Sequence, residues 1–291
     1  MDGIPGIDHL VLSVADLAAA REFFARAGFT LTPRAEHPFG TSNHLAIMDG
    51  NFLELLGTTA PEKIPPHAPG RFSLPAQHRD LLARRQGLSF VVLSSEDARA
   101  DHARFLAAGL PASEPLDFSR RAGQPDGGEA TMSFSIVIVA EPALGDAPHF
   151  VCQQHTPEYF WHAAYQRHAN GAERIAEVVL VAAAPAELAP YYGGLVAPNA
   201  VHAVDGGLAV ETARGRILVL TPEALAGRFA GIDVPGFAPL PYIAGLQVRT
   251  GDLAGAAKCL QTAGIAHAAA SGRLRVAPAV AFGATLEFVE A

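Results

Sequence analysis

The sequence predicts an α+β fold built from four βαβββ modules, arranged as two pseudo-symmetric halves. The first observation is the stretch GIDHLVLSVADLAAAREFFARAGF at residues 6–29, which reads as a strand, a polar break, an amphipathic helix and a terminal glycine. The second is that this pattern recurs along the whole chain. The third is that strand candidates follow each helix, and Asp49-Gly50 between two of them is a strong hairpin signal.

The first module covers residues 6–57. Its helix presents an apolar stripe at helical spacing, made by Leu17, Ala20, Phe23, Phe24 and Ala27. Gly28 follows, where the end of a helix favours a residue that tolerates positive φ. The segments TLTPRAEHP, TSNHLAIM and NFLELLG then supply three strand candidates.

Three further copies follow the same plan. The second begins with GLSFVVLSSEDARADHARFLAAGL (87–110), and MSFSIVIVA and HFVCQQH supply its late strands. The third begins at RIAEVVLVAAAPAELAPYYGGL, and the fourth runs from PYIAGLQVRTGDLAGAAKCLQTAGI to LRVAPAVAFGATLEFVE. Pro-rich stretches separate copies one from two and three from four. We therefore predict an N-terminal domain, residues 1–165, and a C-terminal pair of degenerate modules, residues 166–291.

Composition excludes several classes of function. A net charge of −8 over 291 residues disfavours binding to nucleic acid, which needs a concentrated basic face. No segment approaches the roughly 18 uninterrupted apolar residues of a membrane span, and the first residues lack the features of a signal peptide. We therefore expect a cytoplasmic protein with no membrane partner. Cys152 and Cys259 form no CxxC pattern, so a metal would be held by His, Glu, Asp or Gln.

Four βαβββ units, with a histidine in a first strand and LEL in a fourth, resemble the vicinal oxygen chelate superfamily. That group includes glyoxalase I, the extradiol ring-cleaving dioxygenases and the bleomycin-resistance proteins. The segments GIDHLVLSVADL and GTSNHLAIMDGNFLELLG are most similar to its glyoxalase-like members of unassigned substrate. The architecture covers nearly the whole chain, whereas the specific motifs cover the first unit and residues 149–171.

Strand alternation indicates which side chains share a face of the first module. His9 shares a face with Ile7, Val11 and Ser13, and Asp8 takes the other face. A two-residue turn at Asp49-Gly50 places Leu45 opposite Glu54, so Asn43 lies on the Glu54 face and His44 points away. His37, which precedes Pro38, is interpreted as a loop residue.

His9 and Glu54 are the predicted metal ligands. A carboxylate within FLELL is costly to bury alone, and a metal ion is one partner that removes this cost. The resemblance implies the same pair, because the first and fourth strands of a unit each offer one ligand. A structural His9, or a simple pair between His9 and Glu54, remains the alternative.

The resemblance further implies a third ligand from the second unit, in the stretch 152–155. Imidazole chemistry favours His155, whereas strand alternation favours Gln154, which shares a face with Cys152. In the third unit, Glu177 stands at the position that matches His9. In the fourth unit, Gly245 stands at the position that matches His9, and Glu287 at the position that matches Glu54. One Glu per unit does not make a metal site, so the second half looks structural and ring cleavage is the less favoured reaction.

The resemblance implies a divalent-metal-dependent enzyme of the lyase or isomerase type. The metal (Zn, Mn, Ni or Fe) would act as a Lewis acid on the vicinal oxygens of a small organic substrate. Asn43, Phe52, Phe90 and Gln154 are predicted to line the substrate pocket, and Glu54 is the candidate catalytic residue and alternative general base. The main alternative is a metal-free protein that binds or sequesters a small molecule. A homodimer is one expected assembly.

Overall fold

The computed structural model describes residues 3–68 and 71–291. The elements of the first half are β1 (Ile7–Ser13), α1 (Leu17–Arg26), β2 (Ala35–Glu36), β3 (Thr41–Ile47), β4 (Phe52–Thr58), α2 (Leu74–Leu82), β5 (Gly87–Ser94), α3 (Ala98–Ala107), β6 (Leu116–Gly123), β7 (Glu129–Val139) and β8 (His149–Gln154). Those of the second half are β9 (Ala172–Val181), α4 (Ala189–Leu195), β10 (Val201–Val204), β11 (Gly207–Glu211), β12 (Arg216–Leu220), α5 (Pro222–Arg228), β13 (Tyr242–Thr250), α6 (Leu253–Thr262), β14 (Ala268–Ala270), β15 (Arg273–Val276) and β16 (Thr285–Glu290).

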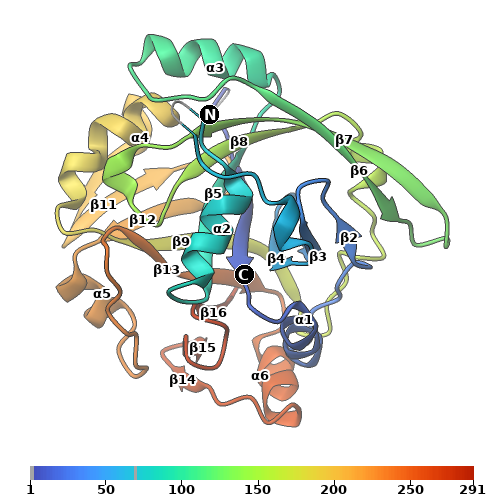
Figure 1. Cartoon of the computed structure of the whole chain (residues 1–291). Coiled ribbons are helices and arrows are strands. Elements are labelled where there is room, and N and C mark those ends of the chain that lie inside the picture. Colours follow the sequence, from blue (N-terminus) through green and yellow to red (C-terminus); the bar gives the residue numbers. More distant parts are fainter. Residues whose placement is uncertain (1–2, 69–70) are drawn as a thin grey trace.

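The predicted α+β fold of four βαβββ modules is confirmed, and each pair of modules forms one eight-stranded sheet (Figure 1). The strand orders are β2-β3-β4-β1-β5-β8-β7-β6 and β10-β11-β12-β9-β13-β16-β15-β14. In both sheets the first strand of each module runs parallel to its last strand, and the two first strands pair antiparallel at the centre. The two halves are therefore pseudo-symmetric.

Three modules repeat the same helix ends. Asp16, Asp97 and Asp252 cap the N-termini of α1, α3 and α6, each by accepting hydrogen bonds from backbone N–H groups of the first turn. Gly28 has a φ of 93°, which confirms the glycine predicted after α1. The third module differs, since its short helix α4 lacks a side-chain cap. None of the described helices is long and apolar enough to cross a membrane.

The hydrophobic residues divide between the two faces of the first sheet. Leu10 and Leu12 point to one face and pack with Val178 and Leu286 of the second sheet in a single core that both halves share. Val11 belongs to a separate cluster on the opposite face, around the pocket described below. The predicted domain boundary at residues 165/166 falls in the connection between β8 and β9, and it stays a prediction.

Two strands of the first half differ from expectation. The segment TLTPRAEHP contributes only β2, and β6, whose sequence is LDFSRRAG, was not among the predicted strands. The turn after β3 is as predicted, because Met48 N donates to Asn51 O (2.9 Å) and Leu45 stands opposite Glu54. The register between β3 and β4 therefore follows from this turn.

Helix α2 is fixed to the first sheet by a buried histidine. His78 Nδ1 lies 2.7 Å from Ser13 Oγ, and its Nε2 lies 3.1 Å from Thr58 Oγ1. Burial lowers the pKa of His78 to about 4. The imidazole is therefore neutral at physiological pH and joins α2 to β1 and β4 through both ring nitrogens.

Replacing His78 by Gln should flatten the pH dependence of stability. The unfolded chain binds this proton near pH 6.5, above the folded value, so the free energy of unfolding falls as pH decreases from about 6.5 to about 4. In His78→Gln the free energy of unfolding should not show this fall between about pH 6.5 and pH 4. Thermal unfolding at several pH values measures it, with the exposed His202→Gln as control. An identical pH profile in wild type and His78→Gln would contradict this account.

Candidate functional site

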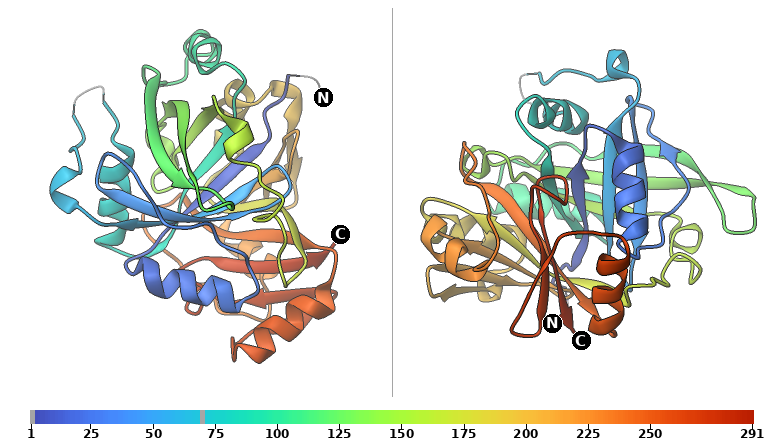
Figure 2. Two further views of the ribbon diagram at one scale, coloured as in Figure 1. Left: turned by 90° about the vertical axis from the view of Figure 1, so that its right-hand side faces the viewer. Right: turned by 90° about the horizontal axis from the view of Figure 1, so that it is seen from below.

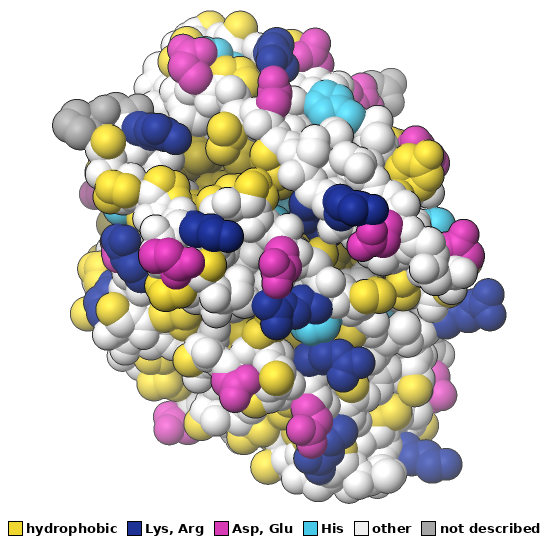
Figure 3. All heavy atoms as spheres, turned by 45° about the vertical axis from the view of Figure 1, so that its right-hand side comes forward, with side chains coloured by type: hydrophobic (Ala, Val, Ile, Leu, Met, Phe, Trp, Pro, Cys, Tyr) yellow, Lys and Arg dark blue, Asp and Glu magenta, His cyan; other side chains and the backbone are white. Residues whose placement is uncertain are grey.

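A cavity of about 590 Å³ lies on the face of the first sheet that does not pack against the second sheet. Its lining residues come from the strands of the first sheet, including β6 and β7, and from the segment 71–75. Figure 2 shows how these elements are arranged. Figure 3 shows hydrophobic side chains gathered in a hollow on this side of the molecule. Its walls are mostly apolar, with many aromatic rings: Phe39, Phe52, Phe72, Phe90, Phe118, Phe134, Phe150 and Phe160. A cavity of this size and lining suits a small organic molecule.

His9 and Glu54 lie together in the wall of this pocket. The parallel pairing of β1 with β4 sets Val11 beside Glu54, and His9 Nε2 lies 3.7 Å from Glu54 Oε2. His9 stacks on Phe52, with ring centroids 4.3 Å apart. Both polar side chains are buried, His9 with 5% and Glu54 with 8% of its surface exposed. The sequence therefore placed this pair on the correct face.

Asp8 joins the site, although strand alternation predicted it on the opposite face. The register between β1 and β5 shifts between Ile7 and His9, which is a bulge that leaves Asp8 unpaired. The Asp8 carboxylate accepts a hydrogen bond of 2.6 Å from His9 Nδ1, and Asp8 Oδ1 accepts one from Gln154 Nε2 (3.1 Å). Asp8 thus fixes the ring of His9 so that Nε2 faces Glu54.

Asn43 and His37 hold the other side of Glu54. Asn43 Nδ2 donates to Glu54 Oε1 (2.5 Å), which agrees with the predicted face, and His37 Nε2 lies 3.8 Å from the same oxygen. Burial lowers the pKa of His37 to about 4, although the charge on Glu54 acts in the opposite direction. His37 is a loop residue as expected, but its loop folds back over the pocket, which the sequence did not indicate.

The remaining predicted residues separate into two groups. Phe52, Phe90 and Gln154 line the pocket. His155 follows the last residue of β8, is exposed, and lies 2.7 Å through Nε2 from Ser135 Oγ, so the structure does not bring it to the His9–Glu54 pair. His44 points away as predicted and contacts the Thr32 carbonyl through Nδ1 (2.8 Å).

Arg120 is a buried charged residue of the pocket that the sequence did not indicate. It lies on β6, where alternation turns Phe118 and Arg120 into the cavity and Arg121 out to solvent. Arg120 is only 7% exposed. The two adjacent arginines of LDFSRRAG were the available signal, but the polar segment gave no reason to expect a strand.

Comparison with known proteins shows the family to which the chain belongs. Residues 7–196 match the family model of the Glyoxalase-like domain, which is well over half of the chain. This chain belongs to the glyoxalase-like family. No functionally curated protein matches it.

Solved structures share the fold of this glyoxalase-like protein. A hypothetical protein from Staphylococcus aureus is 12% identical, with a TM-score of 0.72 over 99% of this chain and 100% of that chain. A mutant of 4-hydroxymandelate synthase from Streptomyces coelicolor is 13% identical, with a TM-score of 0.59 over 99% and 92%. A xylose isomerase-like TIM barrel/4-hydroxyphenylpyruvate dioxygenase fusion protein is 13% identical, with a TM-score of 0.51 over 99% and 49%. The resemblance to the vicinal oxygen chelate superfamily is confirmed.

The pocket of the glyoxalase-like protein offers suitable donor atoms for a divalent cation. His9 Nε2 and the Glu54 carboxylate face each other, and Gln154 Oε1 is buried without a hydrogen-bond partner in the described chain. The contact of His9 Nδ1 with Asp8 is the outer-shell arrangement that metal-binding histidines favour. Across residues 3–68 and 71–291, however, no three His, Cys, Asp or Glu side chains form a metal cluster. The donor types in this part of the pocket, an imidazole, a carboxylate and an amide oxygen, are ones that divalent cations bind.

Cys152 is a poor candidate for the third ligand. Its side chain lines the pocket, but burial raises the pKa of the thiol well above the ordinary value, with further contributions from Asp8 and Glu54. A cysteine binds metal as the thiolate, which this environment disfavours. Gln154, one alternation step farther along the chain, is neutral and carries no such cost.

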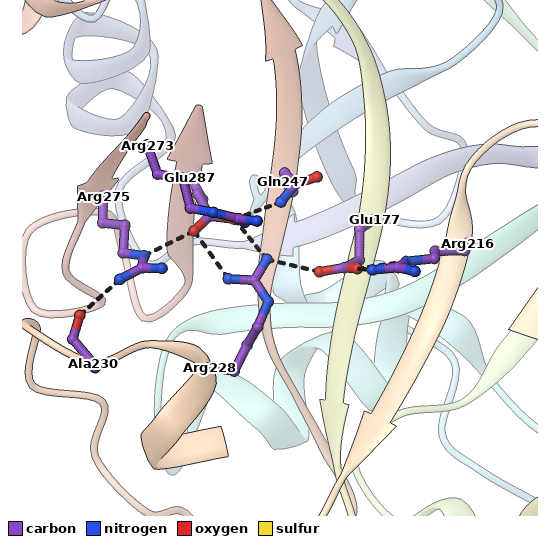
Figure 4. A network of polar contacts seen from close by, with 8 residues as sticks. All are labelled: Glu177, Arg216, Arg228, Ala230, Gln247, Arg273, Arg275 and Glu287. Carbon is purple, nitrogen blue, oxygen red and sulfur yellow. Dashed lines mark hydrogen bonds and ion pairs between the residues drawn. The ribbon is translucent and has the colours of Figure 1, made fainter. Parts of the chain in front are cut away.

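The matching positions of the second half hold an arginine–glutamate network instead (Figure 4). Glu177 on β9 and Glu287 on β16 are 1% and 0% exposed. Arg228 from α5 bridges them, donating to Glu177 Oε1 (2.8 Å) and to both oxygens of Glu287 (2.9 and 2.6 Å). The additional contacts come from Arg216, Gln247, Arg273 and Arg275. Both carboxylates therefore already have cationic partners.

Replacing Glu287 by Gln should strongly destabilise the protein. Burial raises the pKa of Glu287, but hydrogen bonds from Arg228, Gln247 and Arg275 outweigh it and lower the pKa to about 2. Removing the charge takes the carboxylate partner from Arg273 and Arg275 and one of two partners from Arg228, so we expect a loss of about 2–4 kcal/mol, somewhat less than for a fully orphaned buried charge. Chemical denaturation measures this change, with Glu290→Gln, exposed on the same strand, as the control. Equal stabilities of the two variants would refute a structural role for the network.

Proposed function

We propose that this glyoxalase-like protein is a divalent-metal-dependent enzyme of the lyase or isomerase type, acting on a small organic substrate with vicinal oxygens. The observation that carries the proposal is the facing pair of His9 Nε2 and Glu54 Oε2, 3.7 Å apart in a largely apolar pocket, with His9 oriented by Asp8. Such an oriented imidazole and an adjacent carboxylate are what a catalytic metal centre requires.

His9, Glu54 and Gln154 would hold the metal, with Gln154 in place of the exposed His155. When bound, the metal would supply Lewis-acid polarisation of two neighbouring substrate oxygens. Asn43 fixes one oxygen of Glu54 through its amide, which leaves Oε2 directed toward His9. Alternatively, Glu54 would leave the metal and accept a proton from the substrate as a general base.

The apolar walls contribute to the same chemistry. Phe52 covers one face of the His9 ring, and the edge of Phe150 approaches it at 5.6 Å between centroids. These rings limit the access of water to His9 and lower the local dielectric constant. Charge interactions inside the pocket are therefore stronger than at the surface.

A metal-free protein that binds or sequesters a small molecule is the second candidate function. In the described part of the chain, no three His, Cys, Asp or Glu side chains form one cluster that could hold a metal, and this favours the second candidate. In that case Asp8, His9, Glu54 and Asn43 would form a hydrogen-bonded set that recognises polar groups of the ligand. A cytoplasmic location and a homodimer stay predictions for either function.

His9→Ala should remove bound metal, and metal content is the deciding readout, because Asp8 loses its hydrogen bond from His9 in this variant whether or not His9 is a ligand. A structural His9 instead predicts unchanged metal content and a loss of about 1–3 kcal/mol of stability. Elemental analysis and the thermal midpoint, measured on wild type, His9→Ala and Glu54→Gln, distinguish the two. His44→Ala, on the outer face, is the matched control. Wild type that takes up none of zinc, manganese, nickel and iron would instead support the metal-free candidate.

Substitution of Gln154 and His155 separates the two candidate third ligands. Gln154→Leu should weaken metal binding by at least the roughly tenfold to hundredfold that changes around a metal site cost, whereas His155→Leu should not. Competition with a chelator of known affinity measures the difference. If His155→Leu weakened metal binding and Gln154→Leu did not, His155 would be the third metal ligand.

A further inference from the structure

Arg120 is a buried cation without a protein partner in the described chain. Its side chain enters the pocket from β6, and neither an ion pair nor a side-chain hydrogen bond joins it to a described residue. Burial lowers the pKa of Arg120, and the charge on Glu54 raises it, yet Glu54 is not within ion-pair distance. A guanidinium group stays protonated in proteins, so this pocket contains a desolvated positive charge.

Elsewhere in the described chain, arginines that lie beside buried carboxylates pair with them. Arg228 binds both Glu177 and Glu287, and Arg84 binds Asp146 through two hydrogen bonds of 2.7 and 2.8 Å. An unpaired buried charge costs several kcal/mol of stability, so retaining one needs a compensating interaction. An anion that enters the pocket would provide that interaction.

The side chains around Arg120 indicate what the uncharged part of such an anion would look like. The guanidinium lies 5.8 Å from the centroid of the Phe134 ring, and Phe118 stacks on Phe134 at 5.2 Å. Phe39 approaches Phe118 edge-on at 5.7 Å. Flat apolar groups pack well against such rings. These surroundings suit an acidic group attached to an apolar, flat body.

The charges in the pocket are consistent with a monoanion. Glu54 and Asp8, which contacts His9, contribute two negative charges and Arg120 one positive charge, and the exposed Arg71 and Glu114, which also line the cavity, cancel each other. A divalent cation bound at His9 and Glu54 would therefore leave a net charge of about +1. One carboxylate would neutralise it. Arg is the side chain best suited to this role, because its fork of N–H donors matches the two oxygens of a carboxylate.

We propose that the pocket binds an organic monoanion, whose carboxylate pairs with Arg120 and whose flat apolar body lies against Phe118 and Phe134. This inference rests on the proposed function, because it assigns the substrate class of the same site. It also assigns Arg120 as the residue that distinguishes an acid from its uncharged analogue.

Calorimetric titration with 2-naphthoate and 2-naphthamide tests the proposal, because the two compounds share shape and differ in charge. The protein is used as purified, and the comparison with Arg120→Met separates the contribution of Arg120 from any affinity that the carboxylate gains by coordination. Wild type should prefer the naphthoate by about tenfold to hundredfold, the range expected for a charged hydrogen-bonded pair. Arg120→Met should abolish the preference, and Arg120→Lys should retain part of it. Arg121→Met, the exposed neighbour on β6, should keep the wild-type preference.

Stability distinguishes a binding role from a structural one. Because Arg120→Met removes an unpaired buried charge, its thermal midpoint should equal or exceed that of wild type. Equal affinity of wild type for both compounds, no binding of either at millimolar concentration, or an unchanged preference in Arg120→Met would each overturn the proposal. If wild type takes up no metal but shows the Arg120-dependent preference, the metal-dependent function fails and the anion site stands.

Discussion

The parallel pairing of β1 with β4 is the constraint on which the pocket depends. It sets His9 beside Phe52 and Val11 beside Glu54, so that one imidazole and one carboxylate meet on a single face of the sheet. The opposite face of the same strands carries Leu10 and Leu12 into the shared core. Any slip of this register by one residue would move the polar pair into that core and the leucines into the pocket. Core packing therefore fixes the geometry of the site.

The same positions of the repeated module have different surroundings in the two halves. In the second half, Arg228 reaches from α5 to Glu177 and Glu287, and the carboxylates at the site positions are neutralised inside the fold. In the first half the corresponding polar groups face a cavity, and the nearest guanidinium, that of Arg120, remains unpaired among the described residues. The carboxylates of the second half are therefore neutralised within the protein, whereas His9, Glu54 and Arg120 of the first half line a cavity.

The sequence predicted the modules and the His9–Glu54 face because both follow from local patterns, namely strand alternation, helix caps and the Asp49-Gly50 turn. It could not predict Asp8, because the bulge that brings it to His9 arises from the pairing of β1 with β5, two segments about 80 residues apart. Arg120 was missed for a related reason. The strand β6 is polar and mostly exposed, and only its pairing with β7 makes it a strand.

The central claim is that His9 and Glu54 form a metal centre rather than an isolated hydrogen-bonded pair. Anomalous X-ray scattering from crystals supplied with manganese or zinc, recorded on both sides of the absorption edge of the metal, tests it most directly. The account predicts an anomalous peak within bonding distance of His9 Nε2 and the Glu54 carboxylate, in the pocket of the first half. Fully ordered His9 and Glu54 side chains with no peak between them, or a peak only at surface histidines, would contradict it.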